Sequence, residues 1–195
     1  MNKPKIRRTR TRGVFVLIRR PDGSILTCLR KDGQRDIPGG GVKTDIRETR
    51  EAAAAREVWD EIGLRIKTDA EHLFCGGAFQ QRVPKRYHGG ALVLNRHKKP
   101  ILLPGWVFLY IYTDANSVSN MRPQDFACCP HEVESVEWMT IHEMLPRQAE
   151  FKRGAIRMIL RYLRHEFIVK KGQVVSTGPL KDRVEFPYNG YTIIV

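Results

Sequence analysis

Short apolar runs separated by turn residues dominate the first part of the chain. Val14 to Ile18 forms one run, and Ile25 to Leu29 forms another after the turn-forming residues Pro21-Asp22-Gly23. Runs rich in branched side chains on either side of such a turn predict two strands joined as a hairpin. Further strand-like runs are expected at roughly 72–80, 90–95, 105–113 and 133–139.

A helical period follows the Gly-rich stretch at 36–42. Asp45 can cap a helix here, with Glu48 three residues later as its capping-box partner. Gly63 is a typical residue at a helix C-terminus. The pattern therefore predicts a helix over about 46–62.

The last third of the chain predicts two more helices and then short strands. Thr140, with Glu143 three residues later, opens a short helix that ends before Pro146. An amphipathic helix is expected over roughly 148–165. The order of sheet, helix, sheet and helix predicts an α+β protein, an α/β/α layered sandwich around a mixed β-sheet. Short strands are expected at 167–169, 174–175 and 191–195.

The cations of the chain are clustered, and the formal net charge is +13. Residues 1–20 hold lysines and arginines without an acid, a second basic stretch lies within 82–99, and a third lies within 153–164. Clustered cations raise the local concentration of polyanions. Nucleic acid, a nucleotide and an inositol polyphosphate are therefore candidate ligands, and a basic surface that serves solubility is the alternative.

Composition excludes several other classes of protein. No apolar run approaches the ~20 residues of a membrane span. Residues 1–12 are basic, which favours a tail or first strand over a mitochondrial presequence, and no secretory signal follows them. The cysteines, Cys28, Cys75, Cys128 and Cys129, form no C-x-x-C pair, so neither a zinc site nor a thioredoxin-like motif is indicated. Four cysteines in a chain this long do not suggest a disulfide framework. We therefore expect a cytoplasmic protein with no membrane partner.

Three acidic side chains share one face of the helix predicted at 46–62. Glu57, Asp60 and Glu61 are spaced at intervals of three and four residues. Carboxylates this close repel one another unless a cation compensates them. Mg²⁺ prefers oxygen ligands and is commonly held by a few carboxylates together with substrate phosphates. A solvated acidic face balanced by nearby arginines is the alternative.

The wider segment, 40–64, resembles the Nudix box, which is written G-x5-E-x7-R-E-U-x-E-E-x-G-U with U aliphatic. Seven residues follow Glu48, and then come Arg56-Glu57-Val58-Trp59-Asp60-Glu61-Ile62-Gly63-Leu64. Every fixed position from Glu48 onward matches, except that Asp60 replaces the first glutamate of the E-E pair.

Two departures from the box affect the expected site. Val42 stands where the box has its first glycine, because the loop from Pro38 to Glu48 is about two residues longer than in typical members. Gly40 is the counterpart that we expect for the missing glycine. At Asp60 the ligand arm is shorter by one methylene.

The resemblance implies a Nudix fold over residues 1–166, with 167–195 as a C-terminal extension packed on the same domain. It also implies a hydrolase that acts on phosphoric anhydride bonds and depends on Mg²⁺, with Mn²⁺ as a substitute. The metal ligands that it implies are Glu57, Asp60, Glu61 and the carbonyl of Gly40.

Further roles follow from the same resemblance. Glu48 and Arg56 are expected to form a salt bridge that orients the helix, a structural role. Glu132, which precedes a strand that ends at Trp138, is a candidate general base or extra metal ligand. The general base is left open between Glu57 and Glu132, and the catalytic set is Glu57, Glu61 and Glu132.

The substrate is less well defined than the reaction. Arg30, Lys31 and Arg35 lie just before the Gly-rich loop and are candidate phosphate contacts, with a solvated turn as the alternative. The basic surface favours a highly charged substrate: a polyphosphorylated small molecule or an RNA 5′ end. Basic patches leave nucleic-acid binding open, and a homodimer is also left open. The alternative function is a non-catalytic Nudix domain that binds a nucleotide or RNA. For the C-terminal extension we expect sheet completion or dimerisation.

Overall fold

The computed structural model describes residues 12–84, 92–152, 154–180, 185–188 and 191–194. The helices are α1 (Arg50–Ile62), α2 (Ala115–Val118), α3 (Ile141–Met144) and α4 (Ala155–Tyr162), with 3-10 turns η1 (Pro123–Asp125) and η2 (Gln148–Glu150). The strands are β1 (Arg12–Ile18), β2 (Ile25–Arg30), β3 (Arg35–Asp36), β4 (Gly39–Gly41), β5 (Leu73–Pro84), β6 (Leu102–Tyr112), β7 (Val133–Met139), β8 (His165–Lys170), β9 (Gln173–Pro179), β10 (Glu185–Tyr188) and β11 (Tyr191–Ile194).

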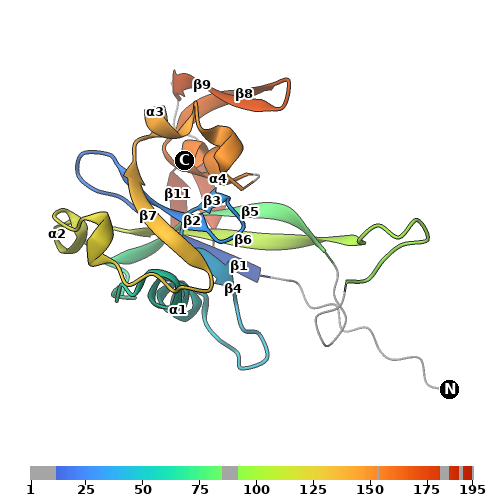
Figure 1. Ribbon diagram of the computed structural model, residues 1–195, viewed down its shortest axis with the longest axis horizontal. Coiled ribbons are helices and arrows are strands. Elements are labelled where there is room, and N and C mark those ends of the chain that lie inside the picture. Colours follow the sequence, from blue (N-terminus) through green and yellow to red (C-terminus); the bar gives the residue numbers. More distant parts are fainter. Residues whose placement is uncertain (1–11, 85–91, 153, 181–184, 189–190, 195) are drawn as a thin grey trace.

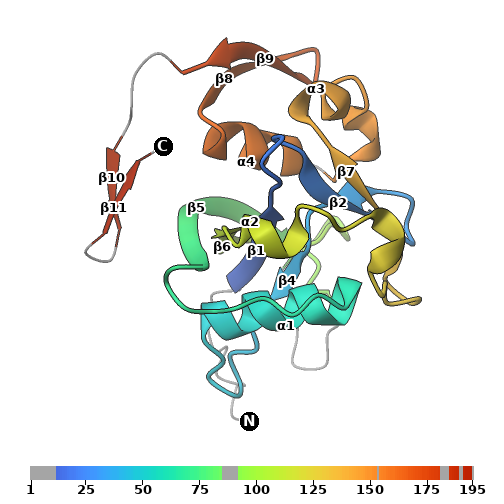
Figure 2. The same ribbon diagram turned by 90° about the vertical axis from the view of Figure 1, so that its left-hand side faces the viewer.

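Two sheets form the middle layer of an α/β/α sandwich, as the sequence predicted. One sheet has the strand order β4-β1-β6-β5, with β1 parallel to β6, and the other has the order β3-β2-β7. Helix α1 covers one face of this layer, and α4 covers the other (Figures 1 and 2). No helix in the described chain combines the length and the apolar character needed to cross a membrane.

Strand β1 contributes to the core on both faces. Val14, Val16 and Ile18 belong to the cluster that includes the buried face of α1, whereas Leu17 belongs to the cluster around α4. Successive side chains of a strand point to opposite faces of the sheet, so a strand covered on both faces is apolar throughout. The continuous apolar run at 14–18 is the sequence signature of this position.

Helix α1 begins four residues later than the sequence predicted. Thr49, and not Asp45, is the N-cap, and its hydroxyl accepts a hydrogen bond from the Ala52 N–H at 3.1 Å. Arg47 has a left-handed backbone (φ 55°), which cannot continue a helix. The expected C-terminus is confirmed, because Gly63 ends the helix with φ 69°.

The expected hairpin of β1 and β2 is wrong. The two strands belong to different sheets, and a single bridge between Arg19 and Ile25 joins their ends. The turn itself is present, because the Arg20 N–H donates to the Ser24 carbonyl at 2.9 Å. Beyond the bridge the strands separate, and β2 pairs with β3 and β7 instead.

The amphipathic helix expected at 148–165 is divided. Residues 148–150 form η2, and α4 begins only at Ala155. Between them Phe151 pairs with Arg35 in a bridge, and Gly154 adopts φ 99°, so the chain leaves the helical path before it re-enters it. Of the strand expected at 90–95, residues 90 and 91 lie outside the described residues, and the rest contains isolated bridges at Leu92 and Leu94 but no strand.

In the part of the chain that the structure describes, the C-terminal extension completes neither central sheet. Strands β8 and β9 pair only with each other, and so do β10 and β11. The Gln148 side chain fixes β9 through two hydrogen bonds with the backbone of Val174, at 2.6 and 3.0 Å. Phe167 and Val174 pack against the core around α4.

Candidate active site

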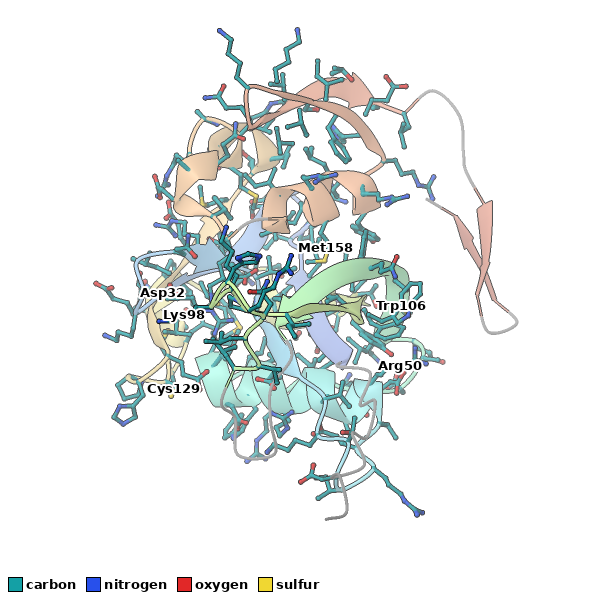
Figure 3. The ribbon with its side chains drawn as sticks, turned by 90° about the vertical axis from the view of Figure 1, so that its right-hand side faces the viewer. Asp32, Arg50, Lys98, Trp106, Cys129 and Met158 are labelled. Carbon is teal, nitrogen blue, oxygen red and sulfur yellow. The ribbon has the colours of Figure 1, made fainter. Side chains whose placement is uncertain are left out.

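The C-terminal half of α1 lies against the glycine strand β4. A Cβ atom on Gly40 would come within 2.5 Å of the Glu57 carboxylate, so only glycine permits this approach. The Gly39 N–H donates to Glu61 Oε2 at 3.1 Å. In Figure 3, Arg50 marks the first turn of α1, and Cys129, whose N–H bonds the Glu61 carbonyl, lies at the other end. The carboxylates of the site therefore gather near the C-terminal end of α1.

Glu61 is buried in an ion pair with Arg30. Its side chain is 1% exposed, and its Oε1 lies 2.5 Å from Arg30 Nη1. Burial raises the pKa of Glu61 to about 7, and the charge and hydrogen bond of Arg30 act in the opposite direction. The strand register shifts between Leu29 and Arg30, and such irregularities redirect the side chain that they carry.

Arg56 forms ion pairs with Glu48, in the loop before α1, and with carboxylates of the site. Its Nε lies 2.7 Å from Glu48 Oε1, so the ion pair that the sequence predicted is present. Its Nη1 lies 2.8 Å from Glu57 Oε1 and 3.6 Å from Asp60 Oδ2. Its Nη2 also donates to the Gly41 carbonyl at 2.9 Å. Arg56 thus connects the loop before α1, the glycine strand and two of the predicted metal ligands.

Glu132 reaches the same guanidinium as Glu61 from a different part of the chain. Its Oε2 lies 3.9 Å from Arg30 Nη1, and its side chain is 59% exposed. The Lys31 N–H donates to the Glu132 carbonyl at 3.1 Å, which holds the loop before β7 against the end of β2. Glu132 is consequently the exposed carboxylate beside a buried one.

The three predicted phosphate contacts lie in different surroundings. Arg30 lies between two carboxylates of the site, and Lys31 has an exposed side chain next to it. Arg35 is buried but lies in a separate ion cluster with two partly exposed carboxylates, with Nη2 2.7 Å from Glu137 and Nε 3.0 Å from Glu150.

Sequence reasoning missed one buried acid near the site. Asp36 is 5% exposed and accepts a hydrogen bond from the Ile37 N–H at 2.9 Å. Burial raises its pKa to about 6, and the charge of Arg30 opposes this rise. A single acid between Arg35 and Ile37 belongs to no periodic pattern or motif, so no signal in the sequence identifies it.

The donor set suits a hard divalent cation in kind, because the Gly40 carbonyl and the α1 carboxylates offer only oxygen. Here two guanidinium groups compensate these carboxylates instead. Within the described ranges, the one group of three acidic or imidazole ligand atoms within 4.8 Å of one another is Asp69, Glu71 and His72, far along the chain from α1. A cation at α1 therefore requires the arginine side chains to move.

The sequence and the fold of the chain are similar to those of known proteins. The chain is 28% identical over 162 residues to an RNA pyrophosphohydrolase of Psychrobacter sp. (strain PRwf-1), which covers 81% of this chain and 86% of that protein. Its fold is similar to that of the MutT protein of Methanosarcina mazei Go1, with a TM-score of 0.52 and 19% identity over 78% of this chain and 91% of that one. It is also similar to the dihydroneopterin triphosphate pyrophosphohydrolase of E. coli, with a TM-score of 0.51 and 18% identity over 77% and 92% of the two chains. The model of the NUDIX domain matches residues 9–159. The chain belongs to the Nudix family.

Proposed function

We propose that this Nudix chain is a Mg²⁺-dependent pyrophosphohydrolase that cleaves a diphosphate bond in a polyphosphorylated substrate. One observation carries the proposal: carboxylates from two distant segments meet beside the glycine strand. Glu61 on α1 and Glu132 before β7 share the guanidinium of Arg30, and Glu57 lies against Gly40. If the acidic face of α1 were only a solvated surface, we would not expect Glu132, from another segment, to contact the arginine that pairs with Glu61.

The chain's own residues supply most of the chemistry in this scheme. A bound Mg²⁺ would neutralise phosphate charge and lower the pKa of a water molecule. Glu132 is exposed and anchored, so it can accept the proton of an attacking water, and Glu57 is the alternative base. Arg30, once it leaves Glu61, can donate two hydrogen bonds to a phosphate oxygen and stabilise the charge that develops during cleavage.

The proposed substrates are polyphosphorylated nucleotides, with the 5′ end of an RNA as the first to test. The similarity to the RNA pyrophosphohydrolase of Psychrobacter and the net charge of +13 support that choice. Dinucleoside polyphosphates and inositol pyrophosphates carry the same anionic chemistry and belong in the same panel.

Release of phosphate and pyrophosphate from this panel in the presence of Mg²⁺ tests the proposal. We expect Glu57→Gln and Glu61→Gln to lose activity by ~100-fold or more. Glu166→Gln on β8 is the matched control, because it removes an exposed carboxylate outside the site and should keep full activity. Full activity of Glu61→Gln would overturn the ligand assignment.

A binding module is the second candidate, and one observation favours it. Glu61 is buried and paired with Arg30, which leaves its carboxylate without access to a substrate. A module of this kind would bind a polyphosphate equally well with Mg²⁺ and with EDTA, and it would release no product from any member of the panel. Binding that requires Mg²⁺, together with turnover, would exclude it.

A further inference from the structure

Trp106 is an exposed indole ring at the point where β6 leaves the core. Its side chain is 40% exposed, whereas no residue at 107–112 is more than 7% exposed. Successive residues of a strand alternate between its two faces, so Trp106 shares a face with Phe108 and Tyr110. Those two rings belong to the cluster that includes the buried face of α1. The ring of Trp106 therefore lies on the same face of the sheet as the helix that carries the candidate metal ligands.

The first turn of α1 covers the other aromatic rings on this face of β6. The Arg50 guanidinium lies 4.4 Å from the centre of the Phe108 ring, and the Tyr110 hydroxyl donates to Glu51 Oε1 at 2.5 Å. The helix begins at Arg50, and Figure 3 shows Arg50 and Trp106 on the same side of the molecule. Trp106, two residues before Phe108, thus lies beside the start of the helix with its ring open to solvent.

Trp106 differs from the other two tryptophans in what lies against its ring. The Arg20 guanidinium lies 4.0 Å from the centre of the Trp138 ring, and that of Arg65 lies 4.7 Å from the centre of the Trp59 ring. Within the residues that the structure describes, neither a cation nor a second aromatic ring lies against Trp106. Among these residues, its ring is therefore available for stacking with a ligand.

The strand register places Trp106 within reach of the glycine strand. Phe108 aligns with Val14 on β1, and Val14 aligns with Gly40 on β4. Neighbouring strands lie about 4.8 Å apart and two residues advance about 6.6 Å along a strand, so Trp106 lies roughly 12 Å from Gly40. An extended nucleoside diphosphate spans a similar distance from its base to its second phosphate. A phosphate held at Glu57, beside Gly40, therefore allows the base of the same molecule to reach Trp106.

We propose that Trp106 is a nucleobase-stacking residue, which binds the first base of a substrate whose polyphosphate lies at the Nudix carboxylates. This role rests on the proposed function and narrows its substrate class. Nucleoside polyphosphates and 5′-polyphosphorylated RNA carry such a base, whereas inositol pyrophosphates do not. Stacking on an aromatic ring tolerates any base, because every base has a π-face. We therefore expect recognition of a base without strong discrimination among the four.

Equilibrium binding tests this role separately from hydrolysis. The full chain with Mg²⁺ is titrated by calorimetry with a methylene-bridged analogue of ATP, which resists cleavage, and with inorganic tripolyphosphate, which carries no base. Trp106→Leu should weaken binding of the analogue by about tenfold and leave the binding of tripolyphosphate unchanged. Trp106→Phe should keep most of the affinity for the analogue, because phenylalanine retains an aromatic face.

Phe74→Leu is the matched control for Trp106→Leu. Phe74 is 41% exposed and lies on the same sheet, but it pairs with Ile111, five residues further along β6. This variant should bind both ligands as the wild type does. Equal affinities of Trp106→Leu and the wild type for the analogue, or equal losses in Trp106→Leu and Phe74→Leu, would overturn the stacking role.

Turnover distinguishes a failure of this role from a failure of the proposed function. In Trp106→Leu the KM for a hydrolysed nucleotide should rise while kcat stays within about twofold, because a ring that lies away from the reacting phosphates contributes binding alone. Base-dependent binding without turnover of any substrate would refute the hydrolysis and support the stacking role. Turnover with the same KM in Trp106→Leu and the wild type would overturn the stacking role and leave the hydrolysis intact.

Discussion

At the scale of single residues, Gly40 is a position where the addition of one carbon atom acts directly on a proposed metal ligand. An alanine Cβ there would lie 2.5 Å from the Glu57 carboxylate, whereas one on Gly41 would meet nothing within 4 Å. We expect Gly40→Ala to displace Glu57 and to lower activity and Mg²⁺ affinity by at least about tenfold. Gly41→Ala should leave both unchanged. Equal effects of the two substitutions on calorimetric Mg²⁺ binding would show that Glu57 does not depend on this contact.

Arg30 makes a second residue-scale test possible, because its guanidinium pairs with Glu61, which we propose as a Mg²⁺ ligand. Arg30→Met should lower the free energy of unfolding by about 3–5 kcal/mol, since it leaves a buried carboxylate without its partner. Mg²⁺ should then raise the melting temperature more in this variant than in the wild type, because the competing guanidinium is gone.

Arg35→Met is the control for Arg30→Met. The two side chains are similarly buried, at 9% and 11% exposure, but Arg35 pairs with Glu137 and Glu150. Its loss should also destabilise the fold, without any change in the response to Mg²⁺. The same Mg²⁺ response in both variants would mean that Arg30 does not compete with the cation for Glu61.

At the scale of elements, the start of α1 can be tested by its cap. Thr49→Ala removes the hydroxyl that accepts the Ala52 N–H and should lower stability by about 1 kcal/mol in urea unfolding. Asp45→Ala should leave stability unchanged within about 0.5 kcal/mol, because this residue lies outside the helix. A larger loss of stability in Asp45→Ala than in Thr49→Ala would support the helix start at Asp45 that the sequence alone predicts.

A four-residue ion cluster fastens η2 to β3 and β7. Arg35 and Arg147 each contact both Glu137 and Glu150, at 2.7–3.0 Å. Hydrogen bonds from Arg147, and then from Arg35, lower the pKa of Glu150 from 4.5 to about 2. A carboxyl group with a lowered pKa stabilises the folded state above its unfolded pKa, and this contribution is lost as the pH falls.

We therefore expect the wild type to lose stability relative to Glu150→Gln as the pH falls from about 4.5 to about 2. Above pH 5 the difference between the two proteins should be constant. Chemical unfolding at a series of pH values measures it. Parallel curves through the acid range would show that the cluster does not hold the charge of Glu150.

Helix α1 shows what local sequence can and cannot predict. Its end follows from Gly63 alone, because a left-handed residue stops a helix wherever it occurs. Its start is less easily predicted. Glu48, the expected capping-box partner of Asp45, accepts hydrogen bonds from Arg56 and from the Lys43 N–H instead. The capping box expected at Asp45 is therefore not formed, because its partner Glu48 is already bonded to the loop residue Lys43 and to Arg56 of the helix.

The same distinction applies to the strands and the candidate site. The Pro21-Asp22-Gly23 turn is local and was predicted, but the separation of β1 and β2 into different sheets depends on β6 and β7. Glu57 and Glu61 are neighbours by helical spacing alone. The pairing of Glu61 with Arg30 joins positions 31 residues apart, so no periodicity reveals it.

At the scale of the whole molecule, part of the basic charge lies on an extension of the sheet that projects past the candidate site. Gly41 pairs with Gly13, which pairs in turn with Val107, so the residues of β6 that precede Val107 project past the glycine strand. Figure 1 shows β5 and β6 extending well beyond the other strands on that side. Asn95 orders the turn on this extension, because its Oδ1 accepts from the Lys99 N–H and its carbonyl accepts from the Lys98 N–H, and the side chains of Lys98 and Lys99 are exposed. A polyanion longer than a nucleotide could reach this turn from the site.

We therefore expect Lys98→Gln/Lys99→Gln to weaken binding of a 5′-triphosphorylated RNA and to reduce the slope of log Kd against log salt by about 1.4. Binding of ATP, which is too short to reach the turn, should not change. Lys170→Gln/Lys171→Gln on the β8–β9 turn is the matched control, with the same loss of charge from another exposed turn. Fluorescence anisotropy against salt measures both variants. Equal slopes would show that net charge alone attracts the RNA, whereas a change confined to the first variant assigns the attraction to the extension beside the site.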